Sequence, residues 1–217
     1  EVVGLVGDNG AGKTTLIKIL TGVVRADKGE IYFKGKKVNI SSPADSLKLG
    51  IEPVHQLGAL IDDMNIAENF FLGREIVNRP VIGWLDKRKM NEICRKTLED
   101  LGIHIDDMNR PVSTLSGGEK QAVAIGKCIH FGGEILVLDE PTASLSLKET
   151  DKVLKYIRNA KEMGRSIILI SHLTRHVYPV ADRFVILERG KKIGDIEKSK
   201  ISKRELETAI VSGRLRR

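Results

Sequence analysis

The stretch that decides the fold of this chain is GDNGAGKT, residues 7–14. It fits the G-x-x-x-x-G-K-[ST] phosphate-binding loop and lies between an apolar run at 2–6 and a helical pattern at 13–20, as that motif requires. Glycines let backbone N–H groups surround phosphates, and the helix start adds positive partial charge. Lys13 would neutralise the phosphates, and Thr14 offers a hydroxyl to Mg²⁺. The candidate binding residues are Gly7, Asn9, Gly10, Ala11, Gly12, Lys13, Thr14 and Thr15.

The composition indicates a globular chain of one domain, or of one domain with a small lobe. The chain has 217 residues, 41% hydrophobic and 30% charged, against about 150 residues for an average domain. Its longest apolar runs, at 135–138 and 167–170, have four residues each, whereas a membrane-spanning helix needs about 18 or more. The net charge of +7 is spread along the chain, so no direct nucleic-acid partner is expected. Cys94 and Cys128 have no metal-ligand spacing, which predicts two reduced core thiols.

Short apolar runs alternate with longer stretches of helical period, and this alternation predicts an α/β fold with a parallel sheet. Strands are expected at 2–6, 30–33, 51–54, 135–138, 167–170, 184–188 and 192–195. Helices are expected at 13–20, 118–131, 148–163 and 202–211. We assign the runs at 30–33 and 51–54 to a small β layer beside the main sheet.

A helical lobe is expected in the middle of the chain. Apolar residues between 90 and 101 recur at helical spacing and form one face of an amphipathic helix. We therefore expect a single domain over 1–217, with a core and β layer made of 1–64 and 132–217, and an inserted α-helical lobe at 65–131.

Two acids follow the apolar run at 135–138. The carboxyl end of a parallel strand, beside a phosphate-binding loop, is where such a sheet places its metal ligand. Asp139 would hold Mg²⁺ through water, and Glu140 would polarise an attacking water. Without the phosphate-binding loop, the same pair would be equally consistent with an exposed acidic turn.

A second anion-binding helix start lies at residues 115–119, LSGGE. Ser116 is a suitable N-cap, and Glu119 completes a capping box. Gly117 and Gly118 expose backbone N–H groups that can bind an anion. A nucleotide that touches both this helix start and the phosphate-binding loop would most simply lie between two copies of the chain.

These motifs, in this order, resemble the ATP-binding cassette of an ABC transporter, a P-loop NTPase with a RecA-like core. The resemblance covers nearly the whole chain and implies an ATPase with ATP and Mg²⁺ as cofactors. It implies three catalytic residues, Glu140, His172 and Gln56, and three metal ligands, Thr14, Gln56 and Asp139. It also implies that Ser116, Gly117 and Gly118 bind ATP held by the opposite subunit of a homodimer. His176 could pair with His172 on a metal, but no third ligand is evident.

A finer resemblance is to the cassettes of bacterial monosaccharide importers of the ribose, xylose and fructose type. It rests on the residues at 42–46, 50–56, 65–75, 141–149 and 171–183. It implies permease subunits in the membrane, a periplasmic or extracellular sugar-binding protein, and a peripheral location on the cytoplasmic face of the cell membrane. Phe70, Phe71 and Leu72 are adjacent and apolar, which favours a docking surface for the permease or burial in the lobe.

Three features depart from the family pattern. Position 119 is Glu where Gln is commoner, and Ser146 stands where most cassettes have Asp. Only six residues precede Gly7, whereas the family has further strands upstream that carry an aromatic residue stacked on adenine. We therefore expect those N-terminal strands to be missing from this chain and assign no adenine-binding residue.

Three other functions remain open at this point. A cassette that serves a different cargo would have the same catalytic residues. A soluble ABC ATPase acting on nucleic acid would carry long coiled coils or a second cassette, and neither is seen here. A P-loop small-molecule kinase would have no use for residues 116–118.

Overall fold

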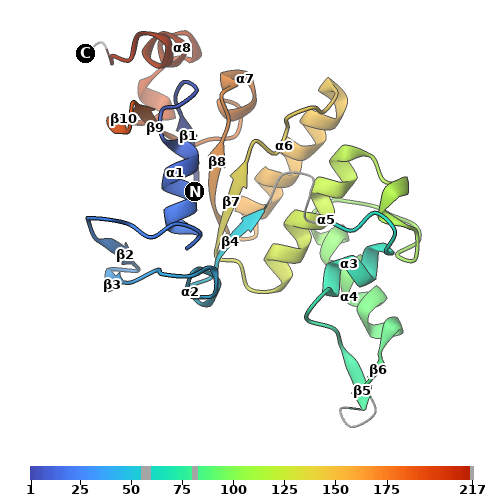
Figure 1. Ribbon diagram of the computed structural model, residues 1–217. Coiled ribbons are helices and arrows are strands. Elements are labelled where there is room, and N and C mark those ends of the chain that lie inside the picture. The colour runs from blue at the N-terminus through green and yellow to red at the C-terminus, as the bar shows by residue number, and fades with distance from the viewer. Residues whose placement is uncertain (55–59, 80–82, 216–217) are drawn as a thin grey trace.

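The computed structural model describes residues 1–54, 60–79 and 83–215. Its centre is a six-stranded sheet in the order β10-β9-β1-β8-β7-β4 (Figure 1). The strands are β1 (Val2–Val6), β4 (Ile51–Val54), β7 (Ile135–Asp139), β8 (Ser166–Ile170), β9 (Arg183–Glu188) and β10 (Lys191–Glu197). All neighbours pair in parallel except β10, which is antiparallel to β9. The predicted α/β fold with a parallel sheet is confirmed.

Helices surround this sheet and form most of the right-hand side of Figure 1. They are α1 (Lys13–Leu20), α2 (Pro43–Lys48), α3 (Ile66–Phe71), α4 (Lys87–Asp100), α5 (Gly117–His130), α6 (Leu147–Glu162), α7 (Thr174–Val177) and α8 (Lys203–Ser212). Short 3-10 turns lie at Val112–Thr114 and Lys198–Lys200. No helix in the described part of the chain is long and apolar enough to cross a membrane.

The small β layer differs from the prediction. Residues 51–54 do not belong to it, because β4 pairs in parallel with β7 at the edge of the main sheet, with Ile51 opposite Ile135 and Val54 opposite Leu138. Three of the four β4 residues are buried, as a strand covered on both faces requires. Among the described residues, this layer consists of the hairpin of β2 (Ile31–Phe33) and β3 (Lys36–Val38).

Helices α3, α4 and α5 pack on one another beside the sheet, and a second hairpin of β5 (Val77–Arg79) and β6 (Trp84–Leu85) projects below them in Figure 1. Phe70 and Phe71 are fully buried in the core that these helices share with the sheet. The docking surface expected at 70–72 is therefore wrong for both phenylalanines, and Leu72 alone of the three is exposed.

Candidate functional site

The phosphate-binding loop joins β1 to α1 at the carboxyl edge of the sheet. Gly12 is the N-cap of α1 with a φ of 99°, a left-handed conformation that favours glycine. Within the described residues no side chain caps α1, whereas a side chain caps each of α2, α3, α4, α5, α6 and α8. The first N–H groups of α1 are therefore available to an anion, as phosphate binding requires.

Lys13 is buried inside this loop. Its Nζ donates to the carbonyl oxygens of Gly7 at 2.8 Å and Asp8 at 2.9 Å. Lys13 is only 8% exposed, so its ammonium group is held at the loop instead of extending into solvent. At Gly7 a Cβ would collide with the backbone carbonyl of Leu187, which explains why the loop begins with a glycine.

Asp139 is the last residue of β7, and Glu140 follows it; both line the same cavity as the phosphate-binding loop. Glu140 has a φ of 47°, which is unusual for a residue with a side chain, and its backbone N–H donates to the Ile170 carbonyl on β8 at 3.0 Å. Its Oε2 accepts from the hydroxyl of Ser171 at 2.8 Å. Its Oε1 accepts from the backbone N–H of His172 at 2.8 Å and lies 2.7 Å from His172 Nδ1.

The backbone N–H of His172 donates to Glu140 Oε1, and the ring of His172 donates to the same oxygen in the tautomer that carries its proton on Nδ1. A carboxylate has about four lone-pair sites, and Ser171 and His172 occupy three of them. Among the described residues, no further donor is bonded to the fourth site, on Oε2.

Most of the predicted site residues line one cavity of about 360 Å³. It is lined by Asn9, Gly10, Ala11, Gly12, Lys13, Thr14, Thr15, Asp139, Glu140, Ile170 and His172. Gln56 lies outside the described residues. Within the described part of the chain, Ser116, Gly117 and Gly118 are not among the residues that line this cavity.

The helix start at Ser116 has the predicted geometry. The Ser116 side chain and Glu119 form a capping box at the start of α5. The start packs on the turn before α6, where a Cβ on Gly117 would come 2.5 Å from Leu145 Cδ2. The carboxyl of Glu149, at the start of α6, has a lowered pKa because Ser146 donates to it and, more weakly, because the N–H groups of Gly118 and Gly117 face it. Within the chain, the N–H groups of Gly117 and Gly118 therefore face the carboxylate of Glu149.

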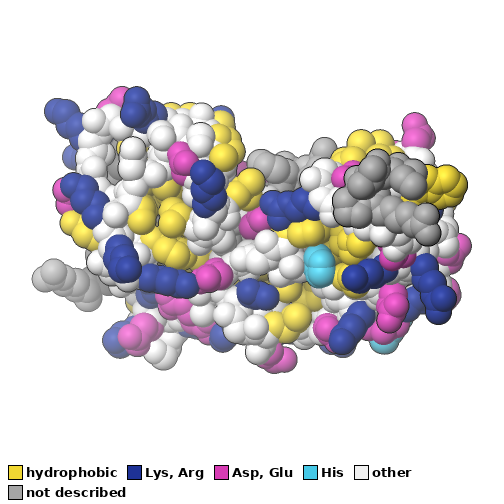
Figure 2. Space-filling view, turned by 90° about the horizontal axis from the view of Figure 1, so that it is seen from below, with side chains coloured by type: hydrophobic (Ala, Val, Ile, Leu, Met, Phe, Trp, Pro, Cys, Tyr) yellow, Lys and Arg dark blue, Asp and Glu magenta, His cyan; other side chains and the backbone are white. Residues whose placement is uncertain are grey.

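A different cavity, of about 270 Å³, lies between β4, α5 and the end of α3. Its walls include Glu52, Leu72, Arg74, Lys127, Cys128 and Phe131. Burial raises the pKa of Glu52 and lowers that of Lys127. Arg74 stacks over the Phe131 ring at 4.7 Å. Figure 2 shows the molecule from below, where a notch separates its two sides and hydrophobic, basic and acidic side chains lie on the surface around it.

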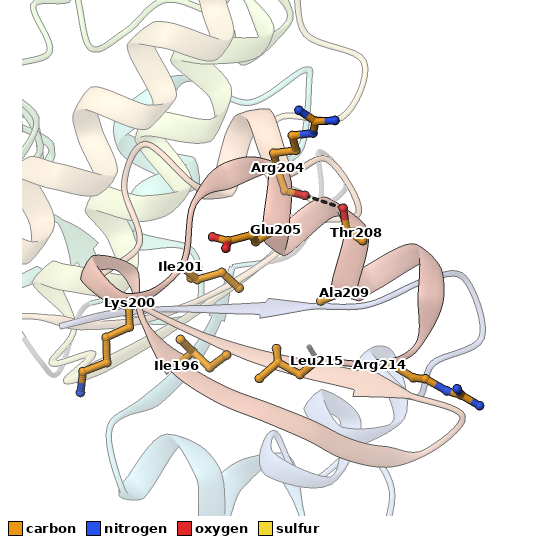
Figure 3. A pocket seen from close by; sticks show the side chains of 9 residues that line it. All are labelled: Ile196, Lys200, Ile201, Arg204, Glu205, Thr208, Ala209, Arg214 and Leu215. Atoms are coloured by element: carbon orange, nitrogen blue, oxygen red, sulfur yellow. Dashed lines mark hydrogen bonds between the residues drawn. The ribbon is translucent and has the colours of Figure 1, made fainter. Parts of the chain in front are cut away.

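A cavity of about 310 Å³ between α8 and β10 lies away from the predicted site. Ile196, Ile201 and Leu215 provide its apolar walls. Figure 3 shows that the charged ends of Lys200, Arg204 and Arg214 point away from one another. The three cations therefore do not converge on a single anion.

A phosphate-binding loop at the carboxyl edge of a parallel sheet, with two acids and a histidine lining the same cavity, is typical of a P-loop NTPase. Residues 1–143 match the model of the ABC transporter family, and the chain belongs to that family. Two solved structures of ATP-binding cassettes from ABC transporters are similar to it at 25% identity. A nucleotide-free cassette has a TM-score of 0.80 over 96% of this chain and 84% of that one. A cassette in its ADP conformation has a TM-score of 0.81 over 99% and 85%.

Curated relatives are closer in sequence. The xylose/arabinose import ATP-binding protein XylG of Sulfolobus acidocaldarius is 45% identical, over 98% of this chain and 83% of that protein. The fructose import ATP-binding protein FrcA of Rhizobium meliloti is 42% identical, over 89% and 76%. The ribose import ATP-binding protein RbsA of Caldanaerobacter subterraneus is 40% identical over all of this chain, which spans only 43% of that relative.

Two polar residues near the site were not predicted from the sequence. Ser171 holds Glu140 and in turn accepts from the backbone N–H of Leu173 at 3.1 Å. Its signal was its place at the end of a strand next to β7, at the same edge of the sheet as Glu140. Thr142 is buried and shares a hydrogen bond with His176, which lies 34 residues further along the chain. The local sequence pattern does not predict that contact.

Proposed function

We propose that this chain hydrolyses Mg-ATP as one of two identical subunits that power the import of a monosaccharide. The observation that carries the proposal is the cavity in which the phosphate-binding loop faces Asp139, Glu140 and His172. Lys13 and the N–H groups at the start of α1 bind the phosphates of ATP. The core formed by 1–64 and 132–217 supplies this cavity, and the lobe at 65–131 supplies the helix start at Ser116.

The hydrolytic step is assigned to Glu140 and His172. Glu140 accepts the proton of the attacking water at its remaining lone-pair site, because Ser171 and His172 orient the carboxylate. His172 orients the γ-phosphate and the water. Thr14 and Asp139 line the same cavity and offer the hard oxygen ligands that Mg²⁺ prefers, and the metal would neutralise phosphate charge. Gln56 is proposed as a further contact to Mg²⁺ and the γ-phosphate on the family resemblance alone.

The dimer follows from the two separate anion-binding helix starts. One triphosphate needs one loop, and Ser116 does not line the cavity that holds Lys13. The start of α5 nevertheless favours a negative charge, as the N-terminus of a helix does. We therefore infer that Ser116, Gly117 and Gly118 bind the γ-phosphate of ATP held by the other subunit, so that two ATP molecules are buried between the copies.

The dimer is tested in a Glu140→Gln background, where bound ATP is not consumed. ATP should convert the monomer into a dimer on size-exclusion chromatography, because ligand shared by two copies stabilises their association. Adding Ser116→Arg should abolish the dimer but leave binding of a fluorescent ATP analogue by the monomer intact. Ser116→Asp keeps an N-cap and introduces a negative charge, so it should also abolish the dimer without weakening α5.

The matched control is Ser113→Arg, an exposed serine one turn earlier, which should leave the dimer unchanged. Loss of ATP binding by a folded Ser116 variant would show that Ser116 acts within its own subunit. A dimer that persists in both Ser116 variants would show that this residue is only a helix cap.

Sugar import is proposed because the relatives named above are import ATP-binding proteins for xylose and arabinose, fructose and ribose. Permease subunits and a sugar-binding protein outside the membrane would then be the partners, and the chain would lie on the cytoplasmic face of the membrane. A cassette for another cargo is the alternative within the family. ATP hydrolysis that is stimulated by a sugar and its binding protein, in the reconstituted transporter, would separate the two.

We further propose that the permease docks in the cavity between β4 and α5. Leu72 is an exposed apolar residue on its wall, and Arg74 and Lys127 offer positive charge beside it. Leu72→Asp should therefore abolish co-purification with the permease and leave ATP binding unchanged. Val211→Asp, on the exposed end of α8, is the control. Intact co-purification of Leu72→Asp would refute docking at this cavity.

A further inference from the structure

Two turns that carry the proposed catalytic pair are joined by a second, buried contact. One turn follows β7 and bears Glu140, and the other follows β8 and bears His172 before it becomes α7. At the exposed end of this junction, Glu140 bonds Ser171 and His172. At its buried end, Oγ1 of Thr142 lies 2.8 Å from Nδ1 of His176.

The environment of His176 fixes which ring nitrogen carries its proton. Arg175 Nε, which can only donate, lies 3.2 Å from His176 Nε2, so Nε2 is the acceptor. Burial, and then the charge of Arg175, lower the pKa of His176 and favour the neutral ring. A neutral ring that accepts at Nε2 carries its proton on Nδ1. His176 therefore donates to the hydroxyl of Thr142.

The turn after β7 depends on its surroundings for its shape. Glu140 and Ser144 both have left-handed backbone conformations, with φ of 47° and 64°, and such residues persist only where neighbouring contacts hold them. Within the turn, the N–H of Ala143 donates to the Glu140 carbonyl at 3.1 Å. The Thr142 side chain is 3% exposed and His176 is 6% exposed, so water does not substitute for their bond.

We propose that His176 is a positioning residue whose bond to Thr142 holds the turn after β7 against α7 and so sets the Glu140 carboxylate against the His172 ring. The proposal rests on the proposed roles of Glu140 and His172. A residue needed only to fill space would be apolar, because a buried polar pair costs desolvation that packing alone does not repay. The hydrogen bond between Thr142 and His176 instead fixes the position of the turn relative to α7.

The test is steady-state ATP hydrolysis by variants that remove each side of the bond. Thr142→Val and His176→Leu should each lower kcat by about 10- to 100-fold, the scale expected when a reacting group is displaced by about 1 Å. The KM for ATP should change less than about twofold, because the phosphate-binding loop is untouched. The double variant should be no slower than the slower single variant, since both changes remove one interaction.

Conservative variants separate positioning from simple packing. Thr142→Ser keeps the hydroxyl, and His176→Asn keeps an N–H donor near the place of Nδ1, so both should retain kcat within about threefold. The matched control is Thr174→Val, which removes the bond from Thr174 Oγ1 to Glu207 Oε1 on the other side of α7. That bond is exposed, and kcat should not change.

The proposal is overturned if Thr142→Val keeps the parental kcat, or if the double variant loses the product of the two single losses. It is also overturned if the single variants lower only the melting temperature. Valine has nearly the same shape as threonine, so Thr142→Val is expected to fold. It therefore tests the proposal even if His176→Leu does not fold. If Glu140→Gln also hydrolyses ATP at the parental rate, the proposed role of Glu140 fails as well; if only Thr142→Val is unaffected, the positioning role of His176 alone fails.

Discussion

Glu140→Gln should lower the rate of ATP hydrolysis by about 10²- to 10⁴-fold, the range expected when a general base is removed. Glutamine has the same length, and its carbonyl oxygen can accept the two contacts from His172 that Glu140 Oε1 now accepts. Its amide group can donate to Ser171, whose hydroxyl can rotate. The site should therefore keep its shape and lose only the group that accepts the proton of the water.

ATP binding should be retained by this variant, because Lys13 and the start of α1 are unchanged. Phosphate release measured under saturating ATP gives the turnover, and a fluorescent ATP analogue gives the affinity. The matched control is Glu134→Gln just before the start of β7, where the carboxylate pairs with Lys34 far from the cavity. Hydrolysis at the parental rate by Glu140→Gln would show that another group accepts the proton.

Lys13→Met should weaken ATP binding by about 10- to 150-fold. Hydrogen bonds to charged groups contribute about 1.5–3 kcal/mol, and each 1.4 kcal/mol changes the dissociation constant tenfold. The variant also leaves the carbonyl oxygens of Gly7 and Asp8 without the donor that now satisfies them. The loop should therefore lose both a phosphate ligand and part of its own support.

The measurement is a titration with fluorescent ATP analogue, and circular dichroism checks that the variant is folded. Lys18→Met removes an exposed lysine from the last turn of the same helix and should leave the affinity unchanged. A folded Lys13→Met variant that binds ATP like the parent would mean that the cavity is not the nucleotide site.

The sequence predicted the first strand and helix to the residue, at 2–6 and 13–20. The strand follows from its apolar run, which is buried. The helix follows from the phosphate-binding loop before it, whose glycines and lysine are typical of a loop that leads into a helix. It also grouped Asp139, Glu140 and His172 correctly at one edge of the sheet, because parallel strands end on the same side.

The sequence placed β4 wrongly for a physical reason. Residues 51–54 predict a strand, but the strand that pairs with them, β7, begins more than 80 residues later. Helices α2 and α5 also pack on β4, and these contacts leave no signal within the four residues. Similarly, α7 has four residues, too few to show a helical period, and the partner of His176 lies 34 residues away. Long-range contacts of single side chains leave no local pattern.

Because no described side chain caps the start of α1, the stability of the fold would depend on the concentration of ATP. Helices α5, α6 and α8 carry side-chain caps, whereas the described residues provide none for α1, so a bound phosphate would be the partner of its first N–H groups. A ligand that binds only the folded state adds stability that grows with its concentration, by about 1.4 kcal/mol for each tenfold increase above the dissociation constant. The polyphosphate that the enzyme consumes would thereby also act as a structural element, and a subunit with an empty loop would be easier to unfold and degrade than one at work.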